Sequence, residues 1–465
     1  MDNMQLYVAQ AVATCFDNDN DAFIPELWAE AGLAILEENM VAASMVHRDF
    51  QNRISNFGDI VNTRRPGEFK INRKTDSDTL TQQDAVATNV QVPLDQWFYT
   101  SFTIKDGEAS YSFQDLVSQY LLPGMQSIAR GIDRAVVGRM GHAFLTNKVG
   151  KLEGLTAATS HDDVLDARET LNINKAYPNN RNLILHPRAE TSLLKNEMFI
   201  KADERGDGGE ALENARLGRI LGFDTFMGQN TPGLNLNLDT VAGTVTNAAA
   251  AGTTGSQTVS ISGHEVVAGE YCVVEGDHQP TYATASTAST NTTAVTLSDA
   301  LKYATEAGAV ITVYTACAVD GGYAAGYSKA ITLDGYTTGK APQVGQLISF
   351  NTGASRRTYT VIEATDSGSS CTVVLDRPLE VALSNDDAAF PGPAGSLNPA
   401  FHRDSFALVT RPLALPNERM GAMSAVAAYN DVAMRVTMQY SINAGGTIVN
   451  LDILGGTAVL DTNLG

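Results

Sequence analysis

Apolar residues recur three or four positions apart in two stretches of the chain, and both patterns predict amphipathic helices. In residues 24–46 the stripe comprises Leu27, Trp28, Ala31, Ile35, Leu36 and Met40. In residues 111–146 it comprises Leu121, Met125, Ile128, Ile132, Val136, Met140 and Phe144, and Pro123 can start or kink this helix. The second stretch also contains three residues that each cost about 1 kcal/mol of helix propensity, Gly131, Gly138 and Gly141. We therefore expect a long helix that packs closely across a sheet.

Residues 54–104 change to short runs in which apolar and polar residues alternate, which predicts strands. The polar tract TDSDTLTQQDA separates the first runs from NVQVPLDQWFYTSFTI, so we expect an extended hairpin of two long strands with a polar tip. Its first arm is basic within an otherwise acidic chain, which fits either a solvated face or a docking surface for acidic neighbours. The candidate interface residues are Arg64, Arg65, Lys70, Arg73 and Trp97, and Lys74 belongs to the same basic run.

Helical and strand-like stretches alternate in residues 161–230, as in a mixed α+β domain. Residues 231–400 differ, because short strands rich in Val, Ile, Thr and Tyr alternate with polar turns, and only 6 Lys plus Arg and 15 Asp plus Glu occur. An internal repeat runs through this segment: TVSISG echoes AITLDG, VAGEYCVVEG echoes VGQLISFNTG, and AVTLSDAL echoes TVVLDRPL. The repeat predicts two tandem all-β modules, at about residues 235–320 and 321–390.

The run FHRDSFALVTRPLALP at residues 401–416 resumes the α+β pattern after the all-β segment. It is followed by AMRVTMQYSINAGGTIVNLDILGG, whose two halves alternate around a Gly-Gly turn, so we expect a hairpin. The last strands should rejoin the first core. The predicted fold class is α+β, interrupted by an all-β insertion of two tandem modules.

The composition of the chain excludes several classes of function. The 465 residues are 43% hydrophobic and 18% charged, which is typical of a globular protein, and the formal net charge is -20. Phosphate backbones would repel such a chain, which argues against a sequence-reading nucleic-acid binder. No run approaches the roughly 18 apolar residues that a membrane span requires, so we expect a soluble chain made in a cytoplasm. The four cysteines stand far apart without a CxxC pair, so the sequence signals neither a zinc site nor a disulfide framework.

Motifs for catalysis are not found in the sequence: HExxH, GxSxG, a Walker loop and a kinase signature do not occur. The nearest candidate is the cluster of His402, Arg403, Asp404 and Ser405. Neighbouring strand residues point to opposite faces, and catalytic triads assemble from distant segments, so ion pairing at the start of a strand is the preferred interpretation. We predict that the chain is not an enzyme and has no catalytic residues, metal site or cofactor.

The order of these parts resembles the major capsid protein of tailed bacteriophages, in the fold shared with the floor of herpesvirus shells. The resemblance rests on an N-terminal FIPELWAEAGLAILEE, the hairpin with FGDIVNTRRPGEF, a long helix centred on IDRAVVG, LGFDTFMGQN, and the closing YNDVAMRVTMQYSINAGGTIVNLDILGG. These motifs are architectural, and their order is more specific than any one of them. The second β module is similar to the insertion domain of one branch of these phages, whereas this chain carries two modules.

The resemblance implies a division of the chain. It comprises an N-terminal arm at residues 1–50, an extended loop hairpin at 51–108, a peripheral domain with a long spine helix at 109–160, an axial domain at 161–230, the all-β insertion at 231–400, and return strands at 401–465 that complete the axial and peripheral domains.

The implied function is a coat protein that self-assembles, as hexamers and pentamers, into an icosahedral shell around double-stranded DNA without sequence-specific binding. The implied location is the virion, with assembly in the cytoplasm of a host bacterium. No N-terminal scaffolding segment is evident in the sequence, so the expected partners are a separate scaffolding protein and a portal protein, with a decoration protein as a further possibility. Two alternatives remain open: another β-rich virion surface protein, such as a decoration protein or an adhesin with tandem modules, and a carbohydrate-active enzyme with accessory β modules.

Overall fold

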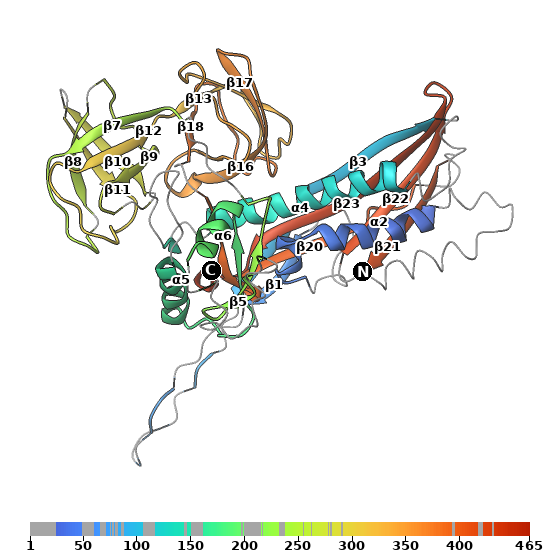
Figure 1. Ribbon diagram of the computed structural model, residues 1–465, viewed down its shortest axis with the longest axis horizontal. Helices are drawn as coiled ribbons and strands as arrows, with labels where there is room; N and C mark the ends of the chain where they lie inside the picture. Colours follow the sequence, from blue (N-terminus) through green and yellow to red (C-terminus); the bar gives the residue numbers. More distant parts are fainter. Residues whose placement is uncertain are drawn as a thin grey trace.

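The protein combines a helix-covered central sheet, a smaller second sheet, two β-barrels and a protruding two-stranded arm (Figure 1). This computed structural model describes residues 25–48, 60–65, 71–74, 76, 79, 82–84, 88–105, 117–143, 147–149, 161–196, 199, 215, 217–231, 238–253, 255–261, 263–277, 279, 281–289, 292–392, 396–416, 422–429 and 432–465. The mixture of helix and sheet confirms the α+β class at the level of secondary structure.

The central sheet is built around the longest strand, β23 (Gly446–Val459). One edge of β23 pairs antiparallel with β3 (Gln96–Lys105). The other edge pairs first with β22 (Val432–Ser441) and then with β20 (Phe406–Arg411), and β21 (Met423–Tyr429) lies beyond β22. Segments more than 300 residues apart in sequence therefore meet in one sheet, and residues 442–445 form the turn of the predicted β22–β23 hairpin.

Two helices cover one face of the central sheet, α2 (Pro25–Asn39) and α4 (Leu122–Ala143) (Figure 1). The two predicted apolar stripes supply much of the main core, in which Trp28, Leu36 and Met125 are fully buried. Because side chains alternate along a strand, Phe98 and Phe102 of β3 pack against this core, whereas Trp97, Tyr99 and Ser101 face the other way.

The start and the path of α4 follow from its proline and glycines. A π-helical turn, η4 (Val117–Leu121), precedes the helix. Pro123 is the second residue of α4, in the first turn, where a backbone N–H would have no partner within the helix, so the proline costs no hydrogen bond. A Cβ added at Gly131 would touch the Phe98 ring at 3.4 Å, and one at Gly138 would lie 2.6 Å from Asp376 Oδ2. The glycines that weaken the helix therefore allow it to approach the sheet and one barrel closely.

A second, four-stranded sheet has the order β19-β4-β6-β5 and is flanked by short helices. Its strands β4 and β6 are parallel, and a separate apolar core lies between this sheet and its helices. The elements are α5 (His161–Ile173), β4 (Arg181–Leu185), α6 (Pro187–Leu194), β5 (Arg219–Ile220), β6 (Phe223–Met227) and β19 (Ala400–His402). The strand β19 comes after both barrels in sequence, so the chain leaves this sheet and later returns to it.

Residues 240–391 fold into two closed six-stranded barrels. The first barrel comprises β7 (Thr240–Val245), β8 (Ser256–Ile261), β9 (Tyr271–Val274), β10 (Thr281–Ser289), β11 (Thr292–Leu297) and β12 (Val310–Tyr314). The second comprises β13 (Cys317–Asp320), β14 (Ile331–Asp334), β15 (Leu347–Phe350), β16 (Arg357–Asp366), β17 (Ser370–Leu375) and β18 (Ala388–Pro391).

The two barrels have the same topology. When β7 to β12 are matched in order to β13 to β18, the strands follow one another around both barrels in the same order. Each barrel also has a register shift at the same place, between Ala283 and Ala285 in β10 and between Val361 and Glu363 in β16. Bulges are reproduced within related folds, so the shared bulge and strand order indicate that the sequence repeat is a duplicated structural unit.

Each barrel docks through the same face. In the first barrel this face contains Tyr271 and Tyr282. The Arg356 guanidinium of the second barrel lies over both rings, 4.6 and 4.2 Å from their centroids, and 5.2 Å from the centroid of Phe390 in its own barrel. Gly269 (φ +106°) lies against Phe390, where a side chain would not fit. Tyr271 and Tyr282 are opposite one another on neighbouring strands, and the equivalent pair in the second barrel is Leu347 and Thr360. This second pair faces α4, where Leu347 lies near Gly141 and Thr360 near Gly138. The order of layers is therefore α4, second barrel, first barrel.

We expect a fragment of residues 238–391 to fold without the rest of the chain. Each barrel has its own buried cluster, and a third cluster with Tyr271 and Phe390 joins the two barrels. The purified fragment should be soluble, show a strand-type circular dichroism spectrum and melt cooperatively. An unfolded fragment would contradict this expectation.

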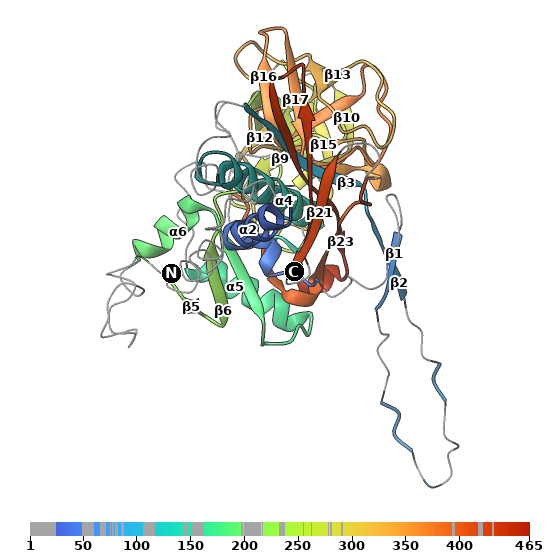
Figure 2. The same ribbon diagram turned by 90° about the vertical axis from the view of Figure 1, so that its right-hand side faces the viewer.

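The arm is a two-stranded ribbon of β1 (Ile60–Arg65) and β2 (Thr88–Pro93) that extends away from the body, as Figure 1 and Figure 2 both show. The predicted second strand of the hairpin divides at residues 94–95: β2 remains with β1, whereas β3 joins the central sheet. Pro93 explains the division, because a proline lacks the N–H that a continuous ladder requires. Of the extended hairpin that was expected at residues 51–108, the part that forms β3 therefore belongs to the central sheet and not to the arm.

Candidate functional site

The arm of β1 and β2 extends away from the rest of the chain (Figure 2). Beyond its paired strands, the described residues at 71–74, 76, 79 and 82–84 are all exposed, and the Ile71 side chain is 96% exposed. An isolated two-stranded hairpin is marginally stable in water at best. The chemistry of the arm therefore favours a second molecule that covers it.

The base of the arm is firmly held, in contrast to its far end. Val92 and Leu94 are buried in a small cluster with residues of β20 and β23, among them Val409 and Leu454. The backbone of Pro93 also lies so close to Gly456 that no Cβ could be placed there. The arm thus begins from a fixed point on the central sheet.

The predicted interface residues are distributed along this arm and its continuation. Arg64 and Arg65 form the last two positions of β1, paired with Asn89 and Thr88. Arg73 lies in the exposed stretch of residues 71–74, as does Lys74, whereas Lys70 lies outside the described residues. Trp97 is on β3, in the central sheet rather than in the arm, with 52% of its surface exposed. The structure therefore places the described basic residues in the stretch from β1 to β2, and Trp97 apart from them in the central sheet.

Trp97 belongs to an aromatic patch on the face of the central sheet that is opposite the two helices. Tyr99 is two residues further along β3, 67% exposed, and its ring centroid is 6.4 Å from that of Trp97. Beside it in the sheet, the buried Asp452 carboxylate is paired with the Arg435 guanidinium, which also donates to the Ala414 carbonyl oxygen. The sequence analysis did not identify Tyr99, although its alternation with Trp97 in a strand signals a shared face.

The cluster at residues 402–405 has the geometry of a helix cap. His402 Nδ1 accepts a hydrogen bond from the Asp404 backbone N–H at 3.2 Å, which caps the short helix η7 (Arg403–Ser405). The Asp404 carboxylate lies 3.5 Å from His47 Nδ1 and 3.7 Å from His402 Nδ1. Ser405 is buried. The Asp404 carboxylate thus lies near two imidazole rings at the start of β20, and ion pairing at this position stays a prediction.

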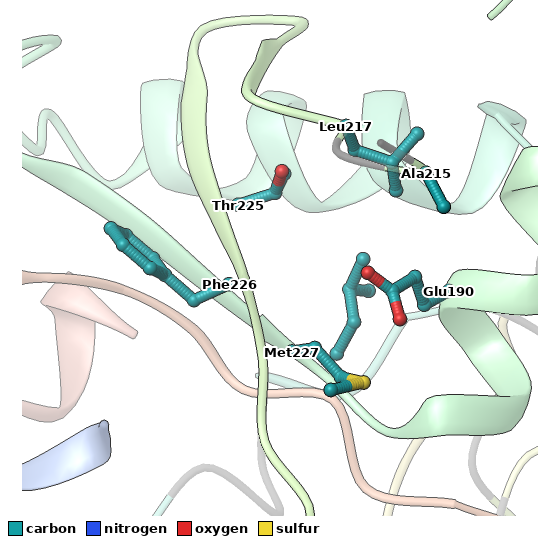
Figure 3. A pocket seen from close by; sticks show the side chains of 7 residues that line it. Glu190, Ala215, Leu217, Thr225, Phe226 and Met227 are labelled. Atoms are coloured by element: carbon teal, nitrogen blue, oxygen red, sulfur yellow. The ribbon is translucent and has the colours of Figure 1, made fainter. Parts of the chain in front are cut away.

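An open hollow of about 310 Å³ lies on the second sheet (Figure 3). Glu190 and Met227 lie opposite Ala215 and Leu217 across it, and burial raises the pKa of the Glu190 carboxyl. The Thr225 hydroxyl donates to the Gly218 carbonyl oxygen and is already engaged. The seven lining residues include one carboxylate and no cation, which is a poor set of groups for a phosphate or nucleotide.

Within the described part of the chain, no group of three or more His, Cys, Asp or Glu residues is placed to hold a metal ion. Burial raises the pKa of the Cys272 and Cys317 thiols, the latter to about 12, so these buried cysteines are inert thiols at neutral pH. None of the helices in the described residues has the length and apolar character needed to cross a membrane.

The single acid of α4 is Asp133, which fastens the N-terminal segment to the middle of the helix. Its two carboxylate oxygens accept hydrogen bonds from the backbone N–H groups of Val41 and Ala43, each at 3.0 Å, and the Asn230 side chain also donates to it. Burial raises the pKa of Asp133 from its ordinary 3.8 to about 6, outweighing the lowering effect of these hydrogen bonds.

The raised pKa of Asp133 predicts a pH dependence with a definite sign. The folded state holds this proton more tightly than the unfolded state, so its contribution to stability is present at low pH and is lost as the pH rises through about 6. Between pH 7 and pH 5 the wild-type chain should gain about 1 kcal/mol relative to Asp133→Asn. Denaturant unfolding of the unassembled protein at both pH values measures the difference. The matched Glu169→Gln variant, on an exposed position of α5, keeps Asp133 and should gain as much as the wild type, whereas an equal gain in Asp133→Asn would contradict the assignment.

Comparisons of the sequence with family models and with curated protein sequences give no match. The fold is similar to a solved structure described as Mycobacterium phage Che8, with 10% sequence identity over 91% of this chain and 89% of that one, at a TM-score of 0.40. It is also similar to the capsid structure of the cyanophage P-SCSP1u, with 12% identity over 89% and 83% of the two chains and a TM-score of 0.39.

A third similar structure is the asymmetric unit of the mature capsid of bacteriophage PhiM1, with 15% identity over 57% of this chain and 83% of that one and a TM-score of 0.28. These structural neighbours come from phages. Two of the three are described as capsids.

Proposed function

We propose that this chain is the major capsid protein of a tailed bacteriophage and assembles with copies of itself into the icosahedral shell that encloses the double-stranded DNA genome. The observation that carries the proposal is the arm: a two-stranded ribbon fixed at its base, exposed beyond it, and basic in a chain of net charge -20. A shell protein needs such an element, because it holds its neighbours by surfaces that its own chain does not bury.

The remaining parts fit the same role. Under this proposal the central sheet with α4 is the peripheral domain and its spine helix, the second sheet belongs to the axial domain, and the two barrels are an insertion between β6 and β19, both strands of that second sheet. A chain leaves and re-enters a domain most easily where the two ends lie close together at its surface. A net negative charge also suits a container from which DNA must be released, since the inner wall then repels the phosphate backbone.

The proposed partners follow from assembly. Neighbouring copies form hexamers and pentamers, a separate scaffolding protein and a portal protein guide closure in the cytoplasm of the host bacterium, and a decoration protein can bind the finished shell. We place the two barrels on the outer surface, because a face beside packed DNA leaves little room for them. The barrels then stabilise neighbouring capsomers or contact the host, or they chiefly support the fold of the subunit.

A decoration protein or adhesin with tandem modules is the second candidate, and the two barrels favour it. Its modules would be expected to stand free of the rest of the chain, whereas here each barrel is fastened to the body. Lys302 of the first barrel forms an ion pair with Asp166 of α5 at 2.7 Å, Lys148 pairs with Asp299 at 2.8 Å, and the second barrel packs on α4. We therefore prefer the shell protein.

Electron microscopy of the purified chain, with and without a scaffolding protein, tests the proposal. Closed shells or capsomer rings are the expected result. A protein that stays monomeric at high concentration, even when scaffolding and portal proteins are supplied, would count decisively against it.

A further inference from the structure

Each barrel contacts the rest of the chain through an equivalent loop. In the first barrel the loop at residues 298–302 follows β11, and in the second barrel the loop at residues 376–380 follows β17. The loops are equivalent because each follows a strand whose last residue pairs beside the shared bulge. The leucine at the fourth position of each loop, Leu301 or Leu379, is buried in the core of its own barrel. These two segments are called the docking loops below.

The docking loops carry opposite charges at two matching positions. The fifth position is Lys302 in the first loop and Glu380 in the second, and the second position is Asp299 in the first and Arg377 in the second. Lys302 is also the single Lys or Arg of residues 231–320, a stretch that is otherwise acidic. Two copies of one structural unit therefore present reversed charges at the same place.

The fifth position of each docking loop lies against a helix residue of the opposite charge. Lys302 Nζ lies 2.7 Å from Asp166 Oδ2 of α5, and the Tyr303 hydroxyl donates to the same oxygen at 3.2 Å. In the second barrel, Glu380 Oε1 lies 3.4 Å from Arg139 Nη2 of α4. The two helices thus present opposite charges where the two barrels meet them.

Asp299 adds a second ion pair to the contact of the first barrel. Its Oδ2 lies 2.8 Å from Lys148 Nζ, and the neighbouring Val149 packs against the core of the second sheet. Lys148 and Asp166 are therefore both carried by the part of the chain that surrounds the second sheet. In the described residues, the apolar core of the second sheet and that of the first barrel have no member in common, so charged groups are the main contacts that fasten this barrel to α5.

An exchange of the two docking loops would bring like charges together. Glu380 would then lie against Asp166, and Lys302 would lie against Arg139, and like charges that face one another across an interface are strongly unfavourable. Specificity depends on repulsion in the wrong arrangement as well as on attraction in the right one. The reversed charges therefore distinguish two docking sites that are offered to two barrels of the same topology.

We propose that the docking loops assign each barrel to its own site: Lys302 directs the first barrel to Asp166 of α5, and Glu380 directs the second barrel to Arg139 of α4. The first contact is the weaker one, because its Lys302 and Asp166 side chains are 35% and 31% exposed, whereas the second loop contains an ion pair whose two side chains are fully buried. The first barrel can therefore leave α5 while the second stays on α4. This assignment is a property of the single subunit and does not depend on shell assembly.

Distances between two nitroxide labels on the full-length, unassembled chain test the assignment. The labels are attached at Asn172→Cys, an exposed position of α5, and at Ala285→Cys, an exposed position of the first barrel. Cys15 is replaced by serine, and the other native cysteines are buried. Pulsed electron paramagnetic resonance should give one narrow distance distribution. In Lys302→Glu the distribution should become about twofold broader, because the barrel no longer stays on α5.

A charge swap shows whether the ion pair itself is responsible. Lys302→Glu together with Asp166→Lys should restore the narrow distribution, because the pair forms again with its charges reversed. The matched control, Lys329→Glu, makes the same change of charge at an exposed position of the second barrel and should leave the distribution narrow. A narrow distribution in Lys302→Glu, equal broadening in the control, or no recovery in the charge swap would each overturn the proposal.

Salt provides a second measurement that leaves the contact unaltered. At about 1 M salt, where the Debye length is about 3 Å, the distribution between α5 and the first barrel should broaden in the labelled chain without any further change. A second pair of labels, at Arg130→Cys on α4 and Thr338→Cys on the second barrel, should keep its narrow distribution, because the ion pair in that docking loop is buried. Broadening of both distributions alike, or of neither, would contradict the assignment.

Discussion

Replacing Arg377 by methionine should lower the free energy of unfolding of the subunit by about 3 to 5 kcal/mol. The Arg377 side chain is fully buried, pairs with the equally buried Asp376, and lies over the Tyr359 ring with its Cζ 4.3 Å from the centroid. Methionine fills a similar volume but leaves the Asp376 carboxylate buried without a counter-charge, and the cost of that uncompensated charge dominates the effect. Chemical denaturation of the unassembled protein, followed by circular dichroism, measures the loss.

Two further variants identify the cause. Lys329→Met, at an exposed position of the same barrel, removes a cation without uncovering a buried anion and should change the stability by less than about 0.5 kcal/mol. The double variant Asp376→Asn with Arg377→Met should recover part of the loss, because neither remaining group is charged. If Arg377→Met and Lys329→Met unfold at the same denaturant concentration, the buried pair does not have the role described.

Reversing the charge of the arm, with Arg64→Glu and Arg65→Glu together, should suppress shell assembly while the subunit remains folded. The two arginines end β1 on a ribbon that contributes little to the core of its own chain, so the fold has little to lose. A single exposed ion pair is worth only about 0.2 to 1 kcal/mol, but a shell repeats each contact in every subunit, and reversal replaces attraction by repulsion. Light scattering and electron microscopy report assembly, and circular dichroism reports folding.

The control keeps the same number of charge changes on another surface. Arg130→Glu with Arg188→Glu alters two cations of the helices α4 and α6, and it should leave the arm contacts intact. Raising the salt concentration should weaken assembly of the wild-type chain in the same direction as the arm variant, because exposed pairs are screened. If the arm variant forms normal shells, Arg64 and Arg65 do not have the role in assembly assigned to them.

Local periodicity was sufficient to locate the helices on the central sheet. The stripe that includes Trp28 and Leu36 predicted the helix at residues 24–46, and the structure has α2 at Pro25–Asn39 followed by a short 3-10 turn, η2 (Ala42–Ser44). The stripe from Leu121 to Met140 likewise matches η4 and α4, while Phe144 lies outside the described residues. A helix can be predicted from sequence because it is held by hydrogen bonds between near neighbours and buries one face at a fixed period.

The candidate interface was predicted less completely. Charge alone identified the basic run of the arm, because five cations close together in an acidic chain are visible without any structure. The exposed aromatic pair of Trp97 and Tyr99 was only half identified, since exposure depends on which face of β3 the helices cover. The ion pair of Arg139 and Glu380 had no signal in the sequence, because the two residues are separated by 241 positions and only the docking of the barrel brings them together.

The sequence by itself determined the elements whose cause is local: the apolar stripes of α2 and α4, the hairpin of β22 and β23, the duplicated β pattern of residues 231–400, and the basic arm. The tertiary structure alone decided how these elements meet. It split the strands β2 and β3 between the arm and the central sheet, closed both repeats into barrels of the same topology, and stacked the first barrel on the second and the second on α4. The physical reason is that strand pairing and barrel docking join groups that are distant in sequence, so each depends on the shape and charge of a surface that exists only after the chain has folded.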